Sequence, residues 1–369
     1  MRPAFKIASG GTDFTNLYEQ RDITIEITET STEHSDSCTV SLSNKDGKIE
    51  VPEDGKTLTI SLGYVDNLTV MGEFIIDSAT MEGPPDGIRF TGKAAPFTSA
   101  TGGFKPFQTR KTRSFDDIKL GDLVSTIAGE CGLTPAVSPS LASVTLPHLD
   151  QTNESGMNLL TRLARDFQAV MKPKQGHLVF AQRGEATSVT GKALGGLTID
   201  KSEVSRYSGN FSNRTKFSKV KTRFHDPEAG VTKLAITDDG GTTVSEEDPD
   251  GDPETGDDNA DYEHPHDYPD EETATAAGKS MLDATQRGAN TVSVTIAGRA
   301  DIVAEGNVTL TGFPSRMNGA WCIKTVKHNF GKGGFTTTIE GEEPGGKAGK
   351  AKKEAKAKEA ESGIVLKQG

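Results

Sequence analysis

The chain is dominated by segments in which apolar and polar residues alternate. At 22–28 the sequence reads DITIEIT, with Ile23, Ile25 and Ile27 at every second position. This period places one face of a strand on a core and the other toward polar surroundings. About five or six such segments follow one another within residues 22–97, separated by turns rich in glycine and proline. The pattern predicts an antiparallel β-unit with enough strands for a small barrel or a strongly curled sheet.

The first of these β-segments are repeated near the end of the chain. Residues 38–93 contain the runs CTVSL, LTISLGY, MGEFII and IRFTG, and residues 291–341 contain TVSVTI, VTLTGF, NGAWCI and FTTTIEG. Gly72 to Ile88 and Gly319 to Phe335 are both sixteen residues apart. The pairs Gly63-Tyr64 and Gly312-Phe313 also match, although the strand before each pair is out of phase by one residue. We therefore predict two similar β-units; the alternative is a chance similarity between unrelated strands.

A helical period appears between the two β-units. Apolar residues share one face of a predicted helix at about 120–131, which Gly132 is placed to end. A second helix is predicted at about 154–167, with Asn153 as its N-cap. A hairpin at 169–183 follows, turning at Lys174-Gln175-Gly176. Because a hairpin alone cannot bury both faces, we expect the helices to cover it.

The rest of the chain mixes strands with strongly polar segments. The run KVKTRF at 219–224 places Lys219, Lys221 and Arg223 on one strand face, either as a solvated surface or as a contact for an acidic partner. Residues 245–272 are acidic and punctuated by proline, so we expect a mobile loop. A helix is predicted at about 271–287, and the Lys, Ala and Glu of residues 346–369 predict a solvated tail, disordered or partly helical. The lone Trp321 alternates with Ile323 and is expected in a core.

Composition narrows the class of protein. The chain has 369 residues, of which 33% are hydrophobic, and a net charge of −12. This charge argues against a grip on nucleic acid by neutralisation of phosphates. Three widely spaced cysteines, Cys38, Cys131 and Cys322, suit neither a disulfide framework nor a zinc site. No apolar run has the length of a membrane span, and the N-terminus lacks the core of a signal peptide, so we expect a reducing, aqueous compartment.

Candidate chemistry is sparse. The close histidines His264 and His266 stand beside acidic residues in YEHPHDY, but a proline-broken loop is a poor holder of metal ligands, so they are weak metal candidates. The run DPDGDPE at 248–254 resembles a calcium loop, yet Pro253 stands where glycine is required. No phosphate loop, GxSxG motif or catalytic cysteine context is present. We therefore expect no catalytic residues, no cofactor and no resident metal.

The order of these segments resembles the late control protein D family of contractile-tailed phages, the baseplate hub proteins. The resemblance rests on SFDDIKLGDLVSTIAGECGL, NESGMNLLTRLARDFQAVMKPKQGHLVF and VTLTGF…GAWCIKTVKHNF…GGFTTTIEGE, and covers about residues 5–345. The N-terminal part of type VI secretion spike proteins is similar in architecture. The resemblance implies a mainly β fold with an α+β insert, in which each β-unit is a tube-type β-barrel. The expected domains are a first barrel at 1–109, the α/β insert at 110–190, a second barrel at 191–345 and the tail at 346–369.

The same resemblance implies a structural, non-enzymatic function in the virion. The chain would form a homotrimer, a pseudo-hexameric ring that joins the six-fold tail tube to the three-fold central spike and lets DNA or tape measure protein pass. The implied partners are the tail tube protein, a separate central spike protein, and baseplate wedge and tape measure proteins, with no membrane insertion and no sequence-specific nucleic acid. The negative charge suggests the hypothesis of an acidic lumen. The alternatives are a tail-associated cell-wall hydrolase and a carbohydrate- or nucleic-acid-binding barrel protein.

Overall fold

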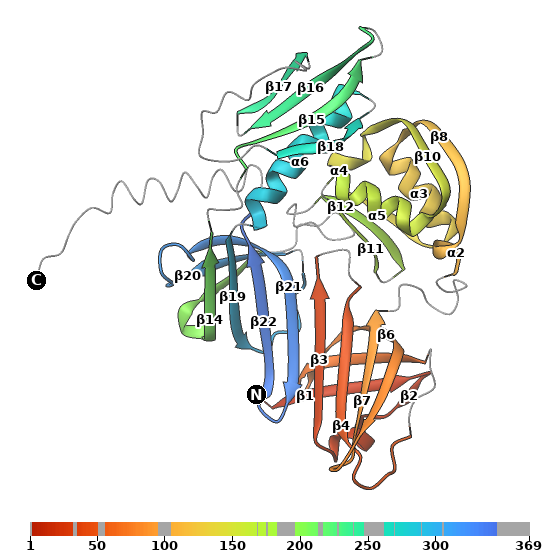
Figure 1. Ribbon diagram of the computed structural model, residues 1–369. Coiled ribbons are helices and arrows are strands. Elements are labelled where there is room, and N and C mark those ends of the chain that lie inside the picture. Colours follow the sequence, from red (N-terminus) through yellow and green to blue (C-terminus); the bar gives the residue numbers. More distant parts are fainter. Residues whose placement is uncertain are drawn as a thin grey trace, which may run out of the picture.

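Strands make up most of the structure, and the mainly β fold with an α+β insert is confirmed. The computed structural model describes residues 2–31, 35–50, 56–94, 105–167, 169–174, 176–182, 196–212, 217–226, 229–238, 240–246, 262–268, 270–288, 290–304 and 306–344. Figure 1 shows a first β-unit in red and orange, an insert in yellow, a second β-unit with blue strands and a small sheet in green. Within the described ranges, no helix is both long and apolar enough to cross a bilayer.

The first β-unit is a curled antiparallel sheet around one core. Its elements are β1 (Pro3–Ser9), β2 (Thr12–Asp13), α1 (Thr15–Glu19), β3 (Ile23–Thr30), β4 (Ser37–Ser43), β5 (Thr57–Tyr64), β6 (Asn67–Glu82) and β7 (Gly87–Ala94). The strands pair in the order β3-β4-β7-β6-β5-β1. Alternate residues of β3, β4 and β7 point inward. Ile25, Val40 and Ile60 are fully buried in one cluster. The two-residue period of the sequence therefore sets which face is the core.

The second β-unit is built from the end of the chain together with two earlier strands. Its elements are β13 (Leu197–Asp200), β14 (Val204–Phe211), β19 (Asn290–Ala297), β20 (Asn307–Thr311), β21 (Gly319–Gly331) and β22 (Gly334–Glu342). The strands pair in the order β14-β19-β22-β21-β20-β13. Trp321 is fully buried in this core, as predicted, and its indole N–H donates to the Met317 carbonyl at 2.6 Å. The three cysteines are also buried.

The two β-units share one strand order, which supports the duplication read from the sequence. β3, β4, β7, β6, β5 and β1 correspond in turn to β14, β19, β22, β21, β20 and β13. The last pair differs, because β1 runs antiparallel to β5 whereas β13 runs parallel to β20. Among the described residues no ladder joins β3 to β1 or β14 to β13, so closure of either unit into a barrel stays a prediction.

The insert packs helices and two small sheets around a separate core. Its elements are α2 (Lys105–Gln108), β8 (Arg110–Lys119), α3 (Leu120–Glu130), β9 (Thr134–Val137), α4 (Pro139–Ala142), β10 (Thr145–Ser155), α5 (Gly156–Asp166), β11 (Ala169–Lys174) and β12 (His177–Gln182). The predicted hairpin is present as β11 and β12, whose last ladder pair is Lys174 with His177. Both predicted helices are present as α3 and α5. The predicted cap of α5 was wrong: Ser155 Oγ accepts from the Asn158 N–H at 3.1 Å, and Asn153 lies in β10 with a φ of 48°.

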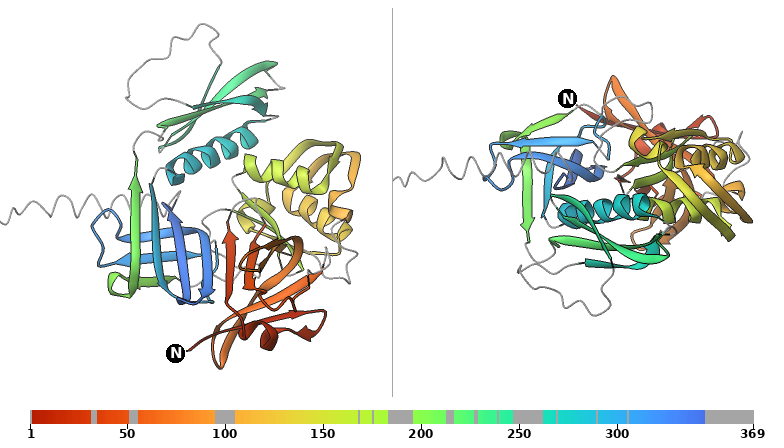
Figure 2. Two further views of the ribbon diagram at one scale, coloured as in Figure 1. Left: turned by 60° about the horizontal axis from the view of Figure 1, so that its bottom comes forward. Right: turned by 90° about the horizontal axis from the view of Figure 1, so that it is seen from above.

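A small sheet with one helix lies between β14 and β19 in the chain. It comprises β15 (Lys219–Asp226), β16 (Val231–Asp238), β17 (Gly241–Glu246), β18 (Tyr262–Tyr268) and α6 (Glu271–Gly288). Figure 2 shows α6 lying along this sheet, which stands apart from the second β-unit. The prediction of a loop at 245–272 was wrong for residues 262–268, which form β18 and pair parallel to β15. Residues 247–261 and the tail at 346–369 lie outside the described residues, and the predicted domain limits stay predictions.

Candidate assembly interface

The two β-units meet edge to edge through β21 and β3. Residues 319–322 of β21 pair with β20, but residues 325–330 pair antiparallel with β3, from Thr325 opposite Thr30 to Phe330 opposite Ile25. This pairing covers the open edge of β3 and merges both units into one 13-stranded sheet. An uncovered edge exposes unpaired backbone groups and is avoided in stable proteins. The β21–β3 ladder is therefore the structural junction of the two units.

The core face of this junction is mostly buried. Val326 and His328 of β21 and Ile25 and Ile27 of β3 are fully buried. The His328 Nδ1 lies 3.1 Å from the Thr337 hydroxyl. Burial lowers the pKa of His328 to about 4, against smaller opposing effects of the Ile302 backbone and Asp301, so the ring is neutral near pH 7. Near pH 7 the junction therefore contains this histidine in its uncharged form.

The same irregularity occurs in β6 and β21 and aligns the two strands residue by residue. The β6–β7 register shifts between Ile76 and Ser78, and the β21–β22 register shifts between Ile323 and Thr325. In each unit the last pair before the shift joins an isoleucine to a glycine: Ile76 to Gly92 and Ile323 to Gly341. Such β-bulges re-aim a strand and are reproducible features of a fold. Residues 78–82 of β6 are therefore equivalent to residues 325–329 of β21, the part that pairs with β3.

This alignment also corrects two details of the predicted repeat. Gly72 and Gly319 are equivalent, since they pair with Ile60 and Leu310. Ile88 and Phe335 are not, because the β21–β22 ladder continues two pairs further, to Gly331 opposite Gly334. The pairs Gly63-Tyr64 and Gly312-Phe313 are also offset by one residue in the structural alignment, as the phase difference in the sequence indicated. The repeat is real in strand order, but equal spacing in the sequence was partly coincidental.

Among the residues that the structure describes, two strand edges lack the partner that their equivalents have. Residues 78–82 of β6 pair with β7 on one side only, and β14, the equivalent of β3, pairs with β19 on one side only. Each segment has a partly exposed side chain on the core side of its sheet: Met81, opposite buried Ile88, is 63% exposed, and Tyr207, opposite buried Val294, is 40% exposed. We name these two segments, residues 78–82 and residues 204–211, the free edges.

The residues singled out for metal or charge chemistry lie away from the free edges. His264 and His266 both fall in β18, where the His264 ring lies 5.5 Å from the Tyr268 ring. Of the basic stripe on β15, Arg223 forms an ion pair with Glu263 of β18, so the acidic segment itself meets the stripe. In the described part of the chain, no group of three or more His, Cys, Asp or Glu is placed to hold a metal ion. The metal and catalytic assignments stay predictions.

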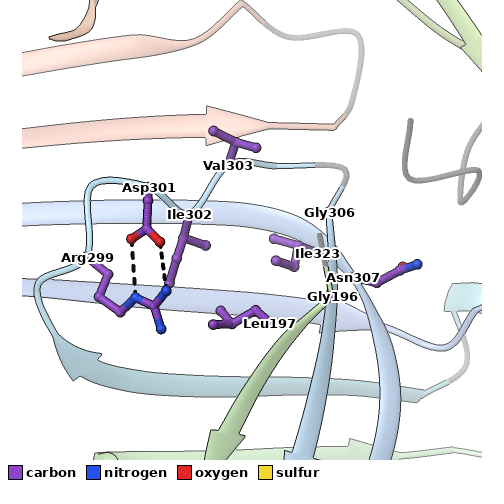
Figure 3. Close-up of a pocket in the computed structure, with 9 residues that line it drawn as sticks. All are labelled: Gly196, Leu197, Arg299, Asp301, Ile302, Val303, Gly306, Asn307 and Ile323. Atoms are coloured by element: carbon purple, nitrogen blue, oxygen red, sulfur yellow. Dashed lines mark hydrogen bonds and ion pairs between the residues drawn. The ribbon is translucent and has the colours of Figure 1, made fainter. Parts of the chain in front are cut away.

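A pocket in the second β-unit offers little for catalysis. One cavity of about 230 Å³ lies at the end of the second β-unit. Figure 3 shows Arg299 and Asp301 on its wall, joined at 2.7 Å and 3.2 Å. The hydrogen bond from Arg299 lowers the pKa of Asp301, which therefore stays ionised rather than available as a general acid. The thiol of Cys38 is equally unsuited to nucleophilic work, because burial raises its pKa to about 12.

Comparison with known proteins identifies the group to which this architecture belongs. The sequence pattern of the phage tail baseplate hub (GPD) family matches residues 107–334. The chain is 28% identical over 366 residues to the probable baseplate hub protein of Escherichia phage 186, covering 92% of both chains. It is 26% identical over 365 residues to the probable baseplate hub protein of Escherichia phage P2, covering 92% of this chain and 93% of that one.

Solved structures show the same fold. A 43 kDa tail protein of prophage MuSo2 from Shewanella oneidensis superposes with a TM-score of 0.65 at 16% identity, covering 91% of this chain and 97% of that chain. A tail protein from Neisseria meningitidis MC58 gives a TM-score of 0.64 at 13% identity, covering 95% of this chain and 99% of that chain. A type VI secretion component of E. coli gives 0.54 at 10% identity, covering 93% and 78%. The chain belongs to the phage tail baseplate hub family and is a structural component of the virion tail.

Proposed function

We propose that three copies of this chain close head to tail into a ring that joins the six-fold tail tube to the three-fold central spike. Each copy supplies two similar β-units, so three copies present six similar faces to the tube and three identical ones to the spike. The observation that carries this proposal is the pair of free edges, which are equivalent to β21 and β3 but, within the described ranges, pair with no strand on that side. The ring would also let DNA or the tape measure protein pass, and baseplate wedge proteins would surround it.

The internal junction predicts how the free edges meet. Transferring the β21–β3 register to the equivalent positions places Ala79 opposite Phe211 and Met81 opposite Gly209 of a second copy. On the core side of the sheet, the large side chains of Phe211 and Met81 then each face a small residue. Burial of Met81 on this contact would contribute about 1.5–3 kcal/mol per interface. The exposed residues Thr80 and Asn210 would be directly opposite one another on the polar face.

The pairing also gives a continuous wall. Within one chain the path β14-β19-β22-β21-β3-β4-β7-β6 is hydrogen-bonded from strand to strand. A β6–β14 contact between copies extends this path from one chain to the next, so closure leaves neither free edge exposed. The proposal involves no catalysis, which fits the ion-paired Arg299 and Asp301 in the pocket of Figure 3.

Cysteine pairs test the proposed contact on the full chain. The variant Thr80→Cys/Asn210→Cys should form disulfides between copies, giving covalent dimers and trimers on a non-reducing gel, since opposed strand residues approach within reach of a disulfide. The matched control Thr80→Cys/Arg206→Cys is four residues out of register and should not cross-link. The native cysteines are buried and should not contribute. Light scattering should show three chains per particle; a monomer at every concentration, or cross-linking of the control alone, would overturn the proposal.

A further inference from the structure

The polar face of the eight-strand path is covered mainly by hydroxyl groups. It is the face opposite the two hydrophobic cores, and its side chains alternate with the buried ones. On β4 and the equivalent β19 these residues are Thr39, Ser41, Ser43, Thr291, Ser293 and Thr295. Some bond one another across strands: Thr295 lies 3.0 Å from Thr338, and Ser78 lies 2.6 Å from Thr91. These hydroxyl groups make the surface polar without adding charge to it.

The charged residues on this face are matched by residues of opposite sign. Lys327 meets Glu340 at 2.8 Å on neighbouring strands. At the two equivalent bulges the polarity is reversed: Asp77 meets Lys93 at 3.9 Å, and Lys324 meets Glu342 at 3.9 Å. These ion pairs hold most of the charge of the face in local dipoles.

The remaining ionisable residues of the face also balance, with two carboxylates and two guanidinium groups. Glu26 and Glu82 stand against Arg89 and Arg206, and Arg89 donates to the Ser41 hydroxyl at 3.3 Å. The chain as a whole has a net charge of −12, so neutrality is a property of this face and not of the protein. The acidic lumen suggested by the total charge is therefore not what the residues of this face provide.

The sheet layers indicate which side of a ring this face would occupy. The eight-strand layer is continuous, whereas the strands folded over the cores, β5 and β1 in one unit and β20 and β13 in the other, share no backbone ladder among the described residues. In a closed ring the inner circumference is the shorter one. The continuous eight-strand layer therefore fits on the inside of the ring. The second layers of the two units are separate, and they have room to diverge only on the outside. The hydroxyl face then surrounds the axis.

We propose that this hydroxyl-rich, charge-compensated face is the wall of the passage, and that its neutrality lets a polyanion move along it without being held. The inference rests on the ring of the proposed function and specifies the chemistry of its lumen. Duplex DNA binds proteins chiefly where unpaired Lys and Arg neutralise phosphates and release counterions. A wall whose lysines already face carboxylates offers few such contacts. It also lacks the excess of carboxylates that would repel the entering end.

Equivalent positions in the two units allow a sharp test. Cys38 and Val292 lie opposite the equivalent glycines Gly92 and Gly341. The residues that follow them, Thr39 and Ser293, are therefore equivalent to each other. The variant Thr39→Lys/Ser293→Lys would therefore place lysines at one level all around the lumen of a trimer. Thr39→Gln/Ser293→Gln is the neutral control for bulk. Thr59→Lys/Thr309→Lys is the control for position, since these residues are equivalent to each other on the outer layer.

The probes are a short linear DNA duplex and a covalently closed DNA circle, added to full-length protein whose trimeric mass has been checked. Wild type and the glutamine variant should bind neither. The Thr39→Lys/Ser293→Lys variant should bind the linear duplex at least about tenfold more tightly, and with about four phosphates contacted its affinity should fall on the order of a hundredfold between about 50 and about 200 mM salt. It should not bind the circle, which cannot thread a ring. Lysines on the outer layer should not distinguish the two probes.

Each contrary result has a separate meaning. Tight, salt-dependent binding of linear duplex by wild type would overturn the neutral wall. Equal binding of circle and linear duplex by the Thr39→Lys/Ser293→Lys variant would place the face outside the ring and overturn the lining. A wild-type chain that stays monomeric would overturn the proposed function itself. If the lysines block assembly, Glu340→Gln replaces them, because it leaves Lys327 without its carboxylate and should raise duplex binding in the same direction.

Discussion

Gly92 and Gly341 occupy the same position in the two β-units and are constrained by the same neighbours. A Cβ atom on Gly92 would lie 2.9 Å from the Ile75 carbonyl oxygen and 3.3 Å from Cys38 Sγ. One on Gly341 would lie 3.5 Å from the Cys322 carbonyl oxygen and 3.1 Å from Val292 Cγ2. Cys38 and Val292 are the residues opposite these glycines on the adjacent strand. The repeat therefore extends to the close approach of strands beside the bulge.

The tighter of these two sites should not accept a side chain. In Gly92→Ala the new methyl group would press on the Ile75 backbone, which cannot rotate away, so we expect about 1–3 kcal/mol of destabilisation. Gly87→Ala on the same strand is the control, because its Cβ would meet only the Leu42 carbonyl oxygen, at 3.6 Å. Urea unfolding followed by circular dichroism measures both. Equal midpoints for the two variants would contradict a steric role for Gly92.

A buried ion pair attaches the insert to the first β-unit. The Lys172 ammonium of β11 lies 3.5 Å from the Asp36 carboxylate and donates to the Thr30 carbonyl at 2.8 Å. Removing one member leaves the other charge buried, so Lys172→Met should cost about 3–5 kcal/mol of unfolding free energy. Adding Asp36→Asn to Lys172→Met should recover part of that loss. A double-mutant cycle in urea measures the coupling, and additive losses would show that the two groups act independently.

The neutral His328 at the β21–β3 junction predicts a pH dependence. Its pKa falls from 6.5 in the unfolded chain to about 4 in the folded one, so the unfolded chain binds the proton more tightly. The contribution of neutral His328 to the free energy of unfolding is constant above pH 6.5. It is lost progressively as pH falls toward 4, by about 3 kcal/mol in total. Thr337 also accepts from the Arg299 N–H at 2.9 Å, so it keeps a partner in His328→Gln.

The His328→Gln variant isolates this effect. It should be less stable than wild type near pH 7 but should lose less stability between pH 6.5 and 4, since glutamine does not titrate. Exposed groups such as His148 are common to both proteins and drop out of the difference. Thermal midpoints recorded across this pH range provide the comparison. Parallel curves for the two proteins would mean that His328 does not carry the predicted pH dependence.

The sequence predicted what depends on local periodicity. Alternation around Ile23, Ile25 and Ile27 gave strand and core face together, and the apolar stripe at 120–131 gave α3 to within one residue. The cap of α5 was wrong because two polar residues, Asn153 and Ser155, compete for one position, and the β10 ladder decides between them.

Features that depend on distant partners could not be read in this way. β18 has a polar, proline-containing sequence and forms a strand because β15 pairs with it and Arg223 meets Glu263. The free edges were missed for a related reason. Only the bulge after Ile76 puts Met81 in phase with the core, and bulges leave no periodic signal. The exposed Met81 indicates an interface only once the bulge is known.

Met81 gives the most direct measure of assembly by mutation. In the isolated chain its side chain is 63% exposed, so Met81→Lys should leave the unfolding free energy unchanged within about 0.5 kcal/mol. In the proposed contact the same lysine would be buried opposite Gly209 without a partner, and assembly should weaken by at least about a hundredfold. Val70→Lys is the matched control, because Val70 is 59% exposed on the same strand but outside the free edge. Sedimentation velocity should show the Met81 variant as a monomer and the Val70 variant as a trimer. Trimers of both would place the interface elsewhere on the chain, since a charge tolerated at position 81 means that β6 does not meet β14 in the transferred register.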